Sequence, residues 1–554
     1  MTASGGSPDA RDVRTPVGHG GPVGHGGPVG PEGPVGRRYH GVRWNEPLVT
    51  ELGTPGQRGL ALPPLDPAIA AEQSAALDAI PPALRRTTAP GLPELAQPLV
   101  LRHFLRLSQM SQGAHLVADT LGTCTMKYSP LVGELIARSP KLLDLHPAQD
   151  PATVQGLLEI VWRCEQLLQA VSGFDAFSFQ GGGGSQGIYT SALVIRAWHE
   201  SRGEASWRNE IITTAFSHPA NAAAAGTVGF RVIQLMPGER GFPDVDALRA
   251  AVSSRTAGLM LTNPEDTGIF NPHVGEFVRL VHEAGGLCAY DQANGNPLLG
   301  MARAADAGFD VGQFNLHKTF GAPHNSVGPG SSAVGVRAGL EAFLPSPIVR
   351  RDGERYVLDE DRPGSVGRVR SWAGNFQVVV RAYAWLLALG DEGLRTVAQT
   401  AVLNNNYLAH LLAAIPGLTI PYEGSGPRLD QIRYSWADLT HETGVTSDDI
   451  VRRTTDYGLQ PYYTSHHPML VPEPMTLEPT EMVSKDDLEE LAAVLAAIAE
   501  EARTTPDVVR NAPHRGPIAA LDEEAADDPA RWAMTWRALV RKRAAAAEVA
   551  AEQD

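Results

Sequence analysis

A glycine run, a carboxylate and a lysine follow one another along the chain, each directly after a stretch of apolar residues. The loop QGGGGSQG (180–187) follows the apolar run 174–179 and precedes a helical pattern. Asp291 ends the apolar run 287–291, and Lys318 follows the stretch 309–316. Glycine N–H groups at a helix N-terminus can bind a phosphate. A carboxylate can keep a pyridinium nitrogen protonated, and a lysine amine can form a Schiff base.

This order of phosphate loop, carboxylate and lysine favours pyridoxal phosphate (PLP) as the cofactor. Two other interpretations stay open from these residues alone. The loop also fits G-x-G-x-x-G at Gly182, Gly184 and Gly187, which is typical of dinucleotide sites, or it forms only a tight turn. Asp291 and Lys318 could equally form an ordinary ion pair.

A framework of alternating helices and strands is predicted to position these residues. Residues 154–171 carry apolar side chains at helical spacing, whereas 258–262 and 287–291 are short apolar runs suited to buried strands. Between these strands, 274–284 reads as an amphipathic helix that ends at Gly285 and Gly286. The resulting βαβ unit predicts a doubly wound α/β domain, with a parallel sheet covered on both faces and strand ends that converge on one crevice.

The composition along the chain predicts five segments. They are a disordered Gly/Pro-rich tail (1–41), an irregular, extended N-terminal arm (42–98), a large PLP-binding domain (99–362), a smaller α+β C-terminal domain (363–505), and a C-terminal docking segment with an exposed helix (506–554). Within the smaller domain, helices are expected at 376–389, 393–413 and 485–503.

Charge and cysteine content exclude several classes of partner. Lys and Arg number 46 against 62 Asp and Glu, a net charge of -16, whereas binding a nucleic-acid backbone needs a basic surface. The three cysteines lack the spacing of zinc or disulfide frameworks, which favours a reducing, cytoplasmic location. No apolar stretch of roughly 20 residues and no signal peptide is evident, so no membrane association is expected.

Longer motifs are similar to those of a known family. They are GTCTMKYSP (122–130), HPAQDP (146–151), LMLTNP (259–264), NLHKTF (315–320), GRVRS (367–371), GNF (374–376) and EPTE (478–481). In order and spacing they resemble the C-terminal half of the P-protein of the glycine cleavage system, which many bacteria make as glycine dehydrogenase (decarboxylating) subunit 2. The resemblance covers roughly residues 42 to 523. It implies the aspartate-aminotransferase-like fold type I of PLP enzymes.

The resemblance also implies roles for individual residues. Catalytic roles fall to Lys318, which would carry the Schiff base, and to His218, which would lie over the cofactor ring rather than being an ordinary core histidine. The residues expected to bind the cofactor are Gly184, Ser185, Gln186, His218, Asp291, Asn294, His317, Lys318 and Thr319, although Thr319 could be purely structural. Those expected to bind substrate are Thr123, Cys124, Thr125, Lys127, Asn221, His324 and Arg370. No metal site is expected.

The chain departs from the family's pattern around the expected cofactor rim. The phosphate loop lacks a histidine and a glutamate of the family, and the family's TNPNTLG is TNPEDTG (262–268) here. The glycine-rich loop of the family becomes PHNSVGPG (323–330). An aromatic pair before a proline becomes His466 and His467, for which we expect a solvated or anion-contacting role rather than metal binding. PLP use is thus better supported than glycine use.

Three functions are consistent with this pattern. The first is a PLP-dependent, lyase-like decarboxylation of glycine, as in glycine dehydrogenase (aminomethyl-transferring), with a separate first subunit and a lipoyl carrier protein. The second is a repurposed PLP enzyme of specialised metabolism, which would decarboxylate another amino acid, eliminate a β or γ substituent or form a C–C bond. The third is a non-catalytic partner subunit. By the same resemblance, we expect a homodimer or a larger assembly.

Overall fold

The computed structural model describes most of the chain beyond its N-terminal segment. The described residues are 39–88, 92–113, 116–118, 120, 122, 129–322, 330–518, 520–521, 528, 535, 537–541 and 544–545. The chain divides into two compact units, Met1–Pro34 and Val35–Asp554, and every described residue belongs to the second. The expected disordered tail therefore falls almost entirely outside the described residues, as does most of the expected C-terminal helix.

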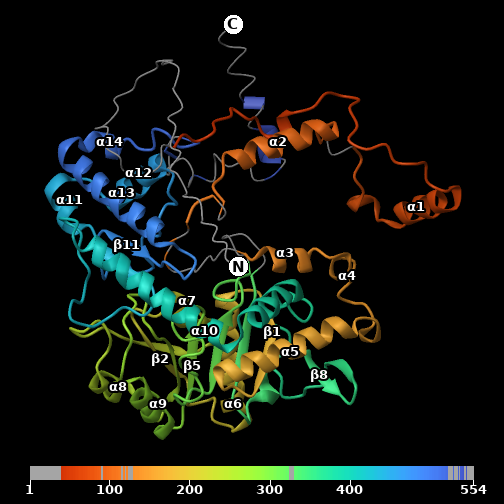
Figure 1. The fold of residues 1–554 in the computed structure, drawn as a ribbon. Coiled ribbons are helices and arrows are strands. Elements are labelled where there is room, and N and C mark those ends of the chain that lie inside the picture. The colour runs from red at the N-terminus through yellow and green to blue at the C-terminus, as the bar shows by residue number, and fades with distance from the viewer. Residues whose placement is uncertain are drawn as a thin grey trace, which may run out of the picture. The chain divides into compact units, whose positions relative to one another are not determined.

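A seven-stranded sheet with the order β1-β7-β6-β5-β4-β2-β3 lies among helices in the lower half of Figure 1. Its strands are β1 (Ala176–Gly181), β2 (Glu210–Thr214), β3 (Arg231–Leu235), β4 (Thr256–Thr262), β5 (Leu287–Gln292), β6 (Val311–Asn315) and β7 (Ser332–Val336). The pairs from β3 to β6 are parallel, as the sequence predicted, whereas β7 runs antiparallel to both β6 and β1. The expectation of a wholly parallel sheet is therefore wrong for β7.

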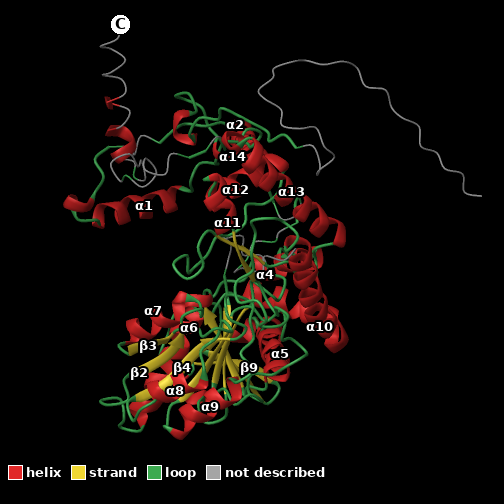
Figure 2. Ribbon diagram, turned by 90° about the vertical axis from the view of Figure 1, so that its left-hand side faces the viewer, coloured by secondary structure: helices red, strands yellow, loops and turns green. Residues whose placement is uncertain are grey.

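Helices flank the strands and bury both faces of the sheet (Figure 2). They are α5 (Gln155–Ser172), α6 (Gly184–Ser201), α7 (Pro219–Val228), α8 (Val245–Ala251) and α9 (Val274–Glu283). Successive side chains of a strand point to opposite faces, so Leu259 and Leu261 pack with α5 and α9, whereas Met260 packs with α6 and α7. This explains why β4 reads as a continuous apolar run. The doubly wound α/β prediction is confirmed.

The C-terminal part has a hydrophobic core of its own. Its elements are α10 (Phe376–Leu412), β10 (Ile432–Ser435), α11 (Ala437–Thr443), α12 (Ser447–Thr454), β11 (Pro474–Leu477), α13 (Lys485–Thr504) and α14 (Pro506–Arg510), with β10 and β11 antiparallel. The two helices expected at 376–389 and 393–413 form α10, interrupted at Gly390, whose φ is 61°. This is the expected α+β arrangement, while the boundary at 362 stays a prediction. A hairpin that the sequence analysis missed, β8 (Ile348–Asp352) with β9 (Arg355–Asp359), precedes it.

The N-terminal arm is more regular than expected. Residues 67–79 form α1 (Pro67–Ala79), because Asp66 caps the helix by accepting from Ala68 N at 2.8 Å and Pro67 occupies the first turn. The arm is joined to α2 (Gln97–Gln109) by the carboxylate of Glu46, which is 2.8 Å from His103 Nδ1. Two short helices, α3 (Leu131–Ala137) and α4 (Pro140–Leu143), lead to α5. Among the described residues, no helix is long and apolar enough to span a membrane.

A buried carboxyl group joins α5 to the edge strand β1. Glu165 on α5 accepts a hydrogen bond from the backbone N–H of Phe177 at 2.9 Å, and the residue is only 8% exposed. Burial raises the pKa of the Glu165 carboxyl to about 7, more than its hydrogen bonds lower it. Folding therefore favours the neutral form of this acid.

This raised pKa makes stability depend on pH. In the unfolded chain Glu165 ionises near its ordinary pKa of 4.5. The stabilisation that its neutral carboxyl gives the folded state is therefore complete below pH 4.5 and is lost as pH rises through about 7. Glu165→Gln keeps a neutral acceptor for Phe177 at every pH. Between pH ~5 and pH ~8, we expect the free energy of unfolding of the variant, measured in urea, to rise by up to ~3 kcal/mol relative to that of the wild type. An equal pH dependence for the two proteins would contradict this.

Candidate functional site

A cavity of about 220 Å³ lies at the carboxyl ends of the parallel strands. Because these strands end at one edge of the sheet, residues far apart in sequence meet there. Asp291 reaches the cavity from β5, Lys318 from the turn after β6, and the first residues of α6 and α7 border it. The predicted site residues that line it are Gly184, Ser185, His218, Asp291, His317 and Lys318, and they are joined by Gln313, Asn315 and His466.

The carboxylate of Asp291 is buried and accepts hydrogen bonds on both oxygens. Oδ1 accepts from Gln313 Nε2 at 2.7 Å and from the backbone N–H of Ala293 at 3.0 Å. Oδ2 accepts from Asn221 Nδ2 at 3.0 Å and from Thr262 Oγ1 at 3.4 Å. Since a buried carboxylate without donors would be costly, these partners stabilise it and fix its position. Asn221, predicted to bind substrate, is thus placed against Asp291.

The glycine loop leads into the N-terminus of α6, as the sequence predicted. Gly183 is the N-cap residue and supplies no side-chain cap, so the first N–H groups of this helix face the cavity edge lined by Gly184 and Ser185. A Cβ added to Gly184 would lie 2.8 Å from Asn315 Nδ2, so glycine is required for this close packing. Gln186 lies beside this anion-binding edge, where its side chain accepts from Gly182 N at 2.7 Å.

Arg370, predicted to bind substrate, lies next to the same loop. A Cβ added to Gly182 would collide with the guanidinium group of Arg370. The Arg370 side chain is exposed and does not line the cavity. A cation beside the helix N-terminus adds to the positive potential of the loop.

Asn294 and Thr319 do not line the cavity but support it through hydrogen bonds. The fully buried hydroxyl of Thr319 donates to Asn294 Oδ1 at 2.9 Å and accepts from Gly295 N at 2.9 Å. Asn294 Nδ2 in turn donates to Asp430 and Glu478 of the C-terminal part. This network joins the turn that carries Lys318 to the second core, which agrees with the structural alternative for Thr319.

His218 is the N-cap residue of α7 and lines the cavity, while its predicted position over the cofactor ring stays a prediction. Its Nδ1 accepts from the backbone N–H of Ala220 at 3.1 Å, so the imidazole caps this helix. Burial lowers the pKa of His218, although the nearby carboxylates of Asp291 and Asp266 oppose this. A neutral ring follows, lying edge-to-face on His466 with ring centroids 4.4 Å apart.

Sequence reasoning missed Gln313 and did not place His466 and Asp266 in one site. Gln313 lies on β6 opposite Asp291 of β5 in the strand register, which only the pairing reveals. His466 comes from the C-terminal part, and the anion that it contacts is Asp266, which follows β4. The predicted substrate residues Thr123, Cys124, Thr125, Lys127 and His324 lie outside the described residues.

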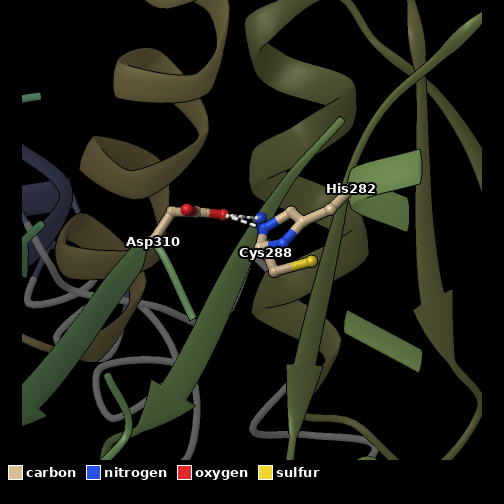
Figure 3. A group of neighbouring side chains, drawn as sticks. All are labelled: His282, Cys288 and Asp310. Carbon is tan, nitrogen blue, oxygen red and sulfur yellow. Dashed lines mark hydrogen bonds and ion pairs between the residues drawn. The ribbon is translucent and has the colours of Figure 1, made fainter. Parts of the chain in front are cut away.

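A second cluster of polar side chains lies at the opposite ends of the strands. His282, Cys288 and Asp310 lie close together there (Figure 3). Among the described residues, this is the one group with the ligand types of a metal centre. His282 Nε2 is 2.7 Å from Asp310 Oδ2, which also accepts from Cys288 N. The sulfur of Cys288 points away from that carboxylate, and burial raises the pKa of its thiol. The contact between His282 and Asp310 joins α9 to the residue that precedes β6, which explains the cluster structurally.

Comparisons with known proteins identify the family. The chain is 42% identical to a probable glycine dehydrogenase (decarboxylating) subunit 2 of Pyrococcus abyssi, over 88% of this chain and 95% of that protein. A protein of the same description from Caldanaerobacter subterraneus is 40% identical over 88% of this chain and 98% of its own length. The family described as glycine dehydrogenase, C-terminal domain, matches residues 397–514. The chain belongs to the glycine dehydrogenase (decarboxylating) subunit 2 family.

Solved structures agree on the fold. A glycine decarboxylase (P-protein) of the glycine cleavage system in inhibitor-bound form superposes with a TM-score of 0.65, at 19% identity, covering 79% of this chain and all of that one. A cysteine desulfurase from Escherichia coli superposes with a TM-score of 0.53, at 18% identity, over 69% of this chain and 94% of the other. The predicted fold type I of PLP enzymes is confirmed.

The cavity of this family member fits PLP. The α6 N-terminus can hold the phosphate, Asp291 can hold the pyridine nitrogen and Lys318 can hold the carbonyl carbon. Two buried atoms of residues that line the cavity, Gln313 Oε1 and Asn315 Oδ1, have no hydrogen-bond partner among the described residues. Because buried polar atoms are rarely left unpaired, these two fit a cavity that takes up a polar guest.

Replacing Gln313 with leucine tests the support of Asp291. The variant keeps the side-chain size but removes a hydrogen bond to a buried carboxylate, which is worth about 1.5–3 kcal/mol. We expect the dissociation constant of PLP, measured by absorbance titration, to rise about 10-fold or more. Gln155→Leu is the matched control, because Gln155 bonds only to the backbone of Pro151 and Tyr356. Equal PLP affinity in the two variants would contradict the role of Gln313.

Proposed function

We propose that this chain binds PLP and decarboxylates glycine as the PLP-carrying subunit of a glycine dehydrogenase. The observation that carries the proposal is the meeting of Lys318, Asp291, His218 and the α6 N-terminus around one cavity. Similarity over nearly the whole length of proteins described as glycine dehydrogenase (decarboxylating) subunit 2 supports the same activity. These relatives do not favour the two alternatives, a repurposed amino acid enzyme and a non-catalytic subunit.

Each residue of the site has a defined task in this proposal. PLP, when bound, supplies an electron sink for the pair left at Cα once the carboxylate departs. Asp291, held by Gln313 and Asn221, would hold the pyridine nitrogen of the cofactor and favour its protonated form. The N-terminus of α6 would anchor the phosphate, and Lys318 would hold the carbonyl carbon of the cofactor, the position that the substrate amine must take.

His218 and the remaining rim residues orient the substrate in this scheme. The imidazole of His218, held by its hydrogen bond from Ala220 N, would lie over the cofactor ring and exclude water from that face. Thr123, Cys124, Thr125, Lys127, His324 and Arg370 stay predictions as substrate-binding residues. A lipoyl carrier protein that accepts the aminomethyl group is part of the proposal. So is a cytoplasmic location, which the free, buried thiols of Cys164 and Cys288 support.

Isotope exchange and cofactor mapping test the activity. With glycine, labelled bicarbonate and the companion subunit, we expect label to enter the glycine carboxyl group, and Lys318→Ala to abolish this exchange. Borohydride reduction followed by peptide mapping should place the pyridoxyl group on Lys318. Lys485→Ala, which removes an exposed lysine paired with Glu489, is the control and should retain both results. A pyridoxyl group on another lysine, or exchange by Lys318→Ala, would contradict the proposal.

The N-terminal arm is proposed to dock on the companion subunit. Leu60, Leu62 and Leu65 are between 56% and 77% exposed, and α1 buries none of its residues within the chain. A run of exposed leucines is costly in water, which indicates a partner surface. The relatives' description as subunit 2 supports a companion chain as this partner, with a homodimer of the chain as the alternative.

Replacing these leucines with serine tests the docking proposal. Each leucine buried at an interface contributes about 1.5–3 kcal/mol, so the triple variant should bind the companion subunit at least ~100-fold more weakly in sedimentation experiments. Triple replacement of Leu131, Val132 and Leu135, exposed apolar residues of α3 outside the arm, is the control. Equal weakening by both variants would contradict a specific role of the arm, and loss of self-association alone would favour the homodimer.

A further inference from the structure

Asp266 and His466 meet beside the cavity, and the proposed function assigns neither of them a task. Asp266 follows β4 at the carboxyl edge of the sheet, and His466 lies in the segment that precedes β11. His466 Nδ1 is 3.3 Å from Asp266 Oδ2. The ring of His466 lines the same cavity as Lys318. A histidine thus reaches the cavity with a carboxylate behind it.

The carboxylate of Asp266 is buried, ionised and fixed in place. The residue is 6% exposed, and its Oδ1 accepts from Gln431 Nε2 at 3.1 Å. Its Oδ2 lies 3.5 Å from His467 Nε2 and 3.8 Å from the guanidinium of Arg433. Burial raises the pKa of Asp266, but contacts with the two histidines and Arg433 outweigh it and hold the pKa well below its usual range. Asp266 can therefore only accept hydrogen bonds.

This fixes which nitrogen of His466 can do chemistry. Because a carboxylate only accepts, the Nδ1 facing it carries a hydrogen, and Nε2 is left as the nitrogen that takes up or releases a proton. Packing holds the ring edge-to-face against His218 and tilted against Tyr463, with the latter ring centroids 5.0 Å apart. A carboxylate that orients the Nδ1–H of a histidine is the arrangement of an acid–base dyad.

His218 cannot supply the same proton as readily. Its Nδ1 accepts a hydrogen bond from the backbone N–H of Ala220. Among the described residues, no carboxylate accepts a hydrogen bond from its ring. His466 combines an oriented ring with a position at the cavity, and its side chain keeps 21% exposure, through which solvent can restore a proton. His466 is thus the better placed general acid.

We propose that His466 is a further catalytic residue, which donates a proton to Cα of the substrate, and that Asp266 is its positioning residue. The inference rests on the proposed glycine decarboxylation. The bond between Cα and the carboxylate breaks and CO₂ leaves, while the electron pair stays with the substrate. When no carrier takes up that pair, it forms a C–H bond with the proton from His466 Nε2, and solvent reprotonates the ring. Without a carrier, glycine is converted to CO₂ and methylamine, so atoms and charge balance.

Two reactions of the PLP-loaded protein with its companion subunit separate this step from decarboxylation. Exchange of labelled bicarbonate breaks and remakes only the Cα–carboxyl bond, whereas release of methylamine requires the new C–H bond. His466→Phe keeps a ring against His218 and Tyr463 but removes both nitrogens. We expect methylamine release to fall about 100-fold or more, as for loss of a general acid, with bicarbonate exchange changed less than ~10-fold.

The control is another histidine paired with an aspartate. His282→Asn removes the imidazole that contacts Asp310 at the opposite ends of the strands, and both reactions should keep their wild-type rates (Figure 3). Unchanged methylamine release in His466→Phe, or an equal fall in both reactions, would overturn the role of His466. Wild-type protein without bicarbonate exchange would instead overturn the proposed function, and this inference with it.

Nitrogen NMR of histidine-labelled protein without PLP tests the positioning role separately from activity. The spectrum of His466→Phe identifies the His466 signals. We expect the neutral ring of His466 to carry its proton on Nδ1 in the wild type and to shift toward the Nε2 form in Asp266→Ala, with the His282 signals unchanged. The same tautomer in both proteins would exclude Asp266 as the positioning residue.

Discussion

The buried carboxylate of Asp291 is the constraint on which the rest of the site depends. An ionised group at this depth is tolerated only with hydrogen-bond donors around it, and these come from β6, α7 and the end of β4. The strand register and the position of α7 are therefore tied to one side chain. The same donors aim the carboxylate at the cavity, where it can hold a pyridine nitrogen. Stability and cofactor chemistry thus share one set of contacts.

The polar groups behind this centre connect it to the second core. Thr319 and Asn294 link the lysine turn to Asp430 and Glu478, so the C-terminal part holds the back of the site. His466 belongs to the same part and reaches the cavity itself. Because residues of both parts line or support the cavity, a shift of one part against the other would misplace catalytic groups. Such misplacement lowers the reaction rate steeply.

Two departures from the family's pattern that were separate in sequence meet in space. Asp266 stands in the altered TNPEDTG motif, and His466 replaces part of an aromatic pair nearly 200 residues later. The structure brings the carboxylate and the imidazole to 3.3 Å. A carboxylate beside aromatic rings would be poorly compensated, whereas one beside two histidines and an arginine is stabilised. The changes at Asp266 and His466 therefore compensate each other. They are compatible with the glycine chemistry of the family.

The sequence by itself determined the alternation of strands and helices, the family, and the order of glycine loop, Asp291 and Lys318, because periodicity and motifs are local properties of the chain. It could not give the reversed direction of β7, since strand direction is decided by pairing. The sequence analysis also missed helix α1, although Asp66 as a cap and Pro67 in the first turn are local signals that indicate a helix start. Gln313 and the contact of Asp266 with His466 appeared only in the tertiary structure. They depend on the register of β5 with β6 and on the packing of the C-terminal part, which no local pattern encodes.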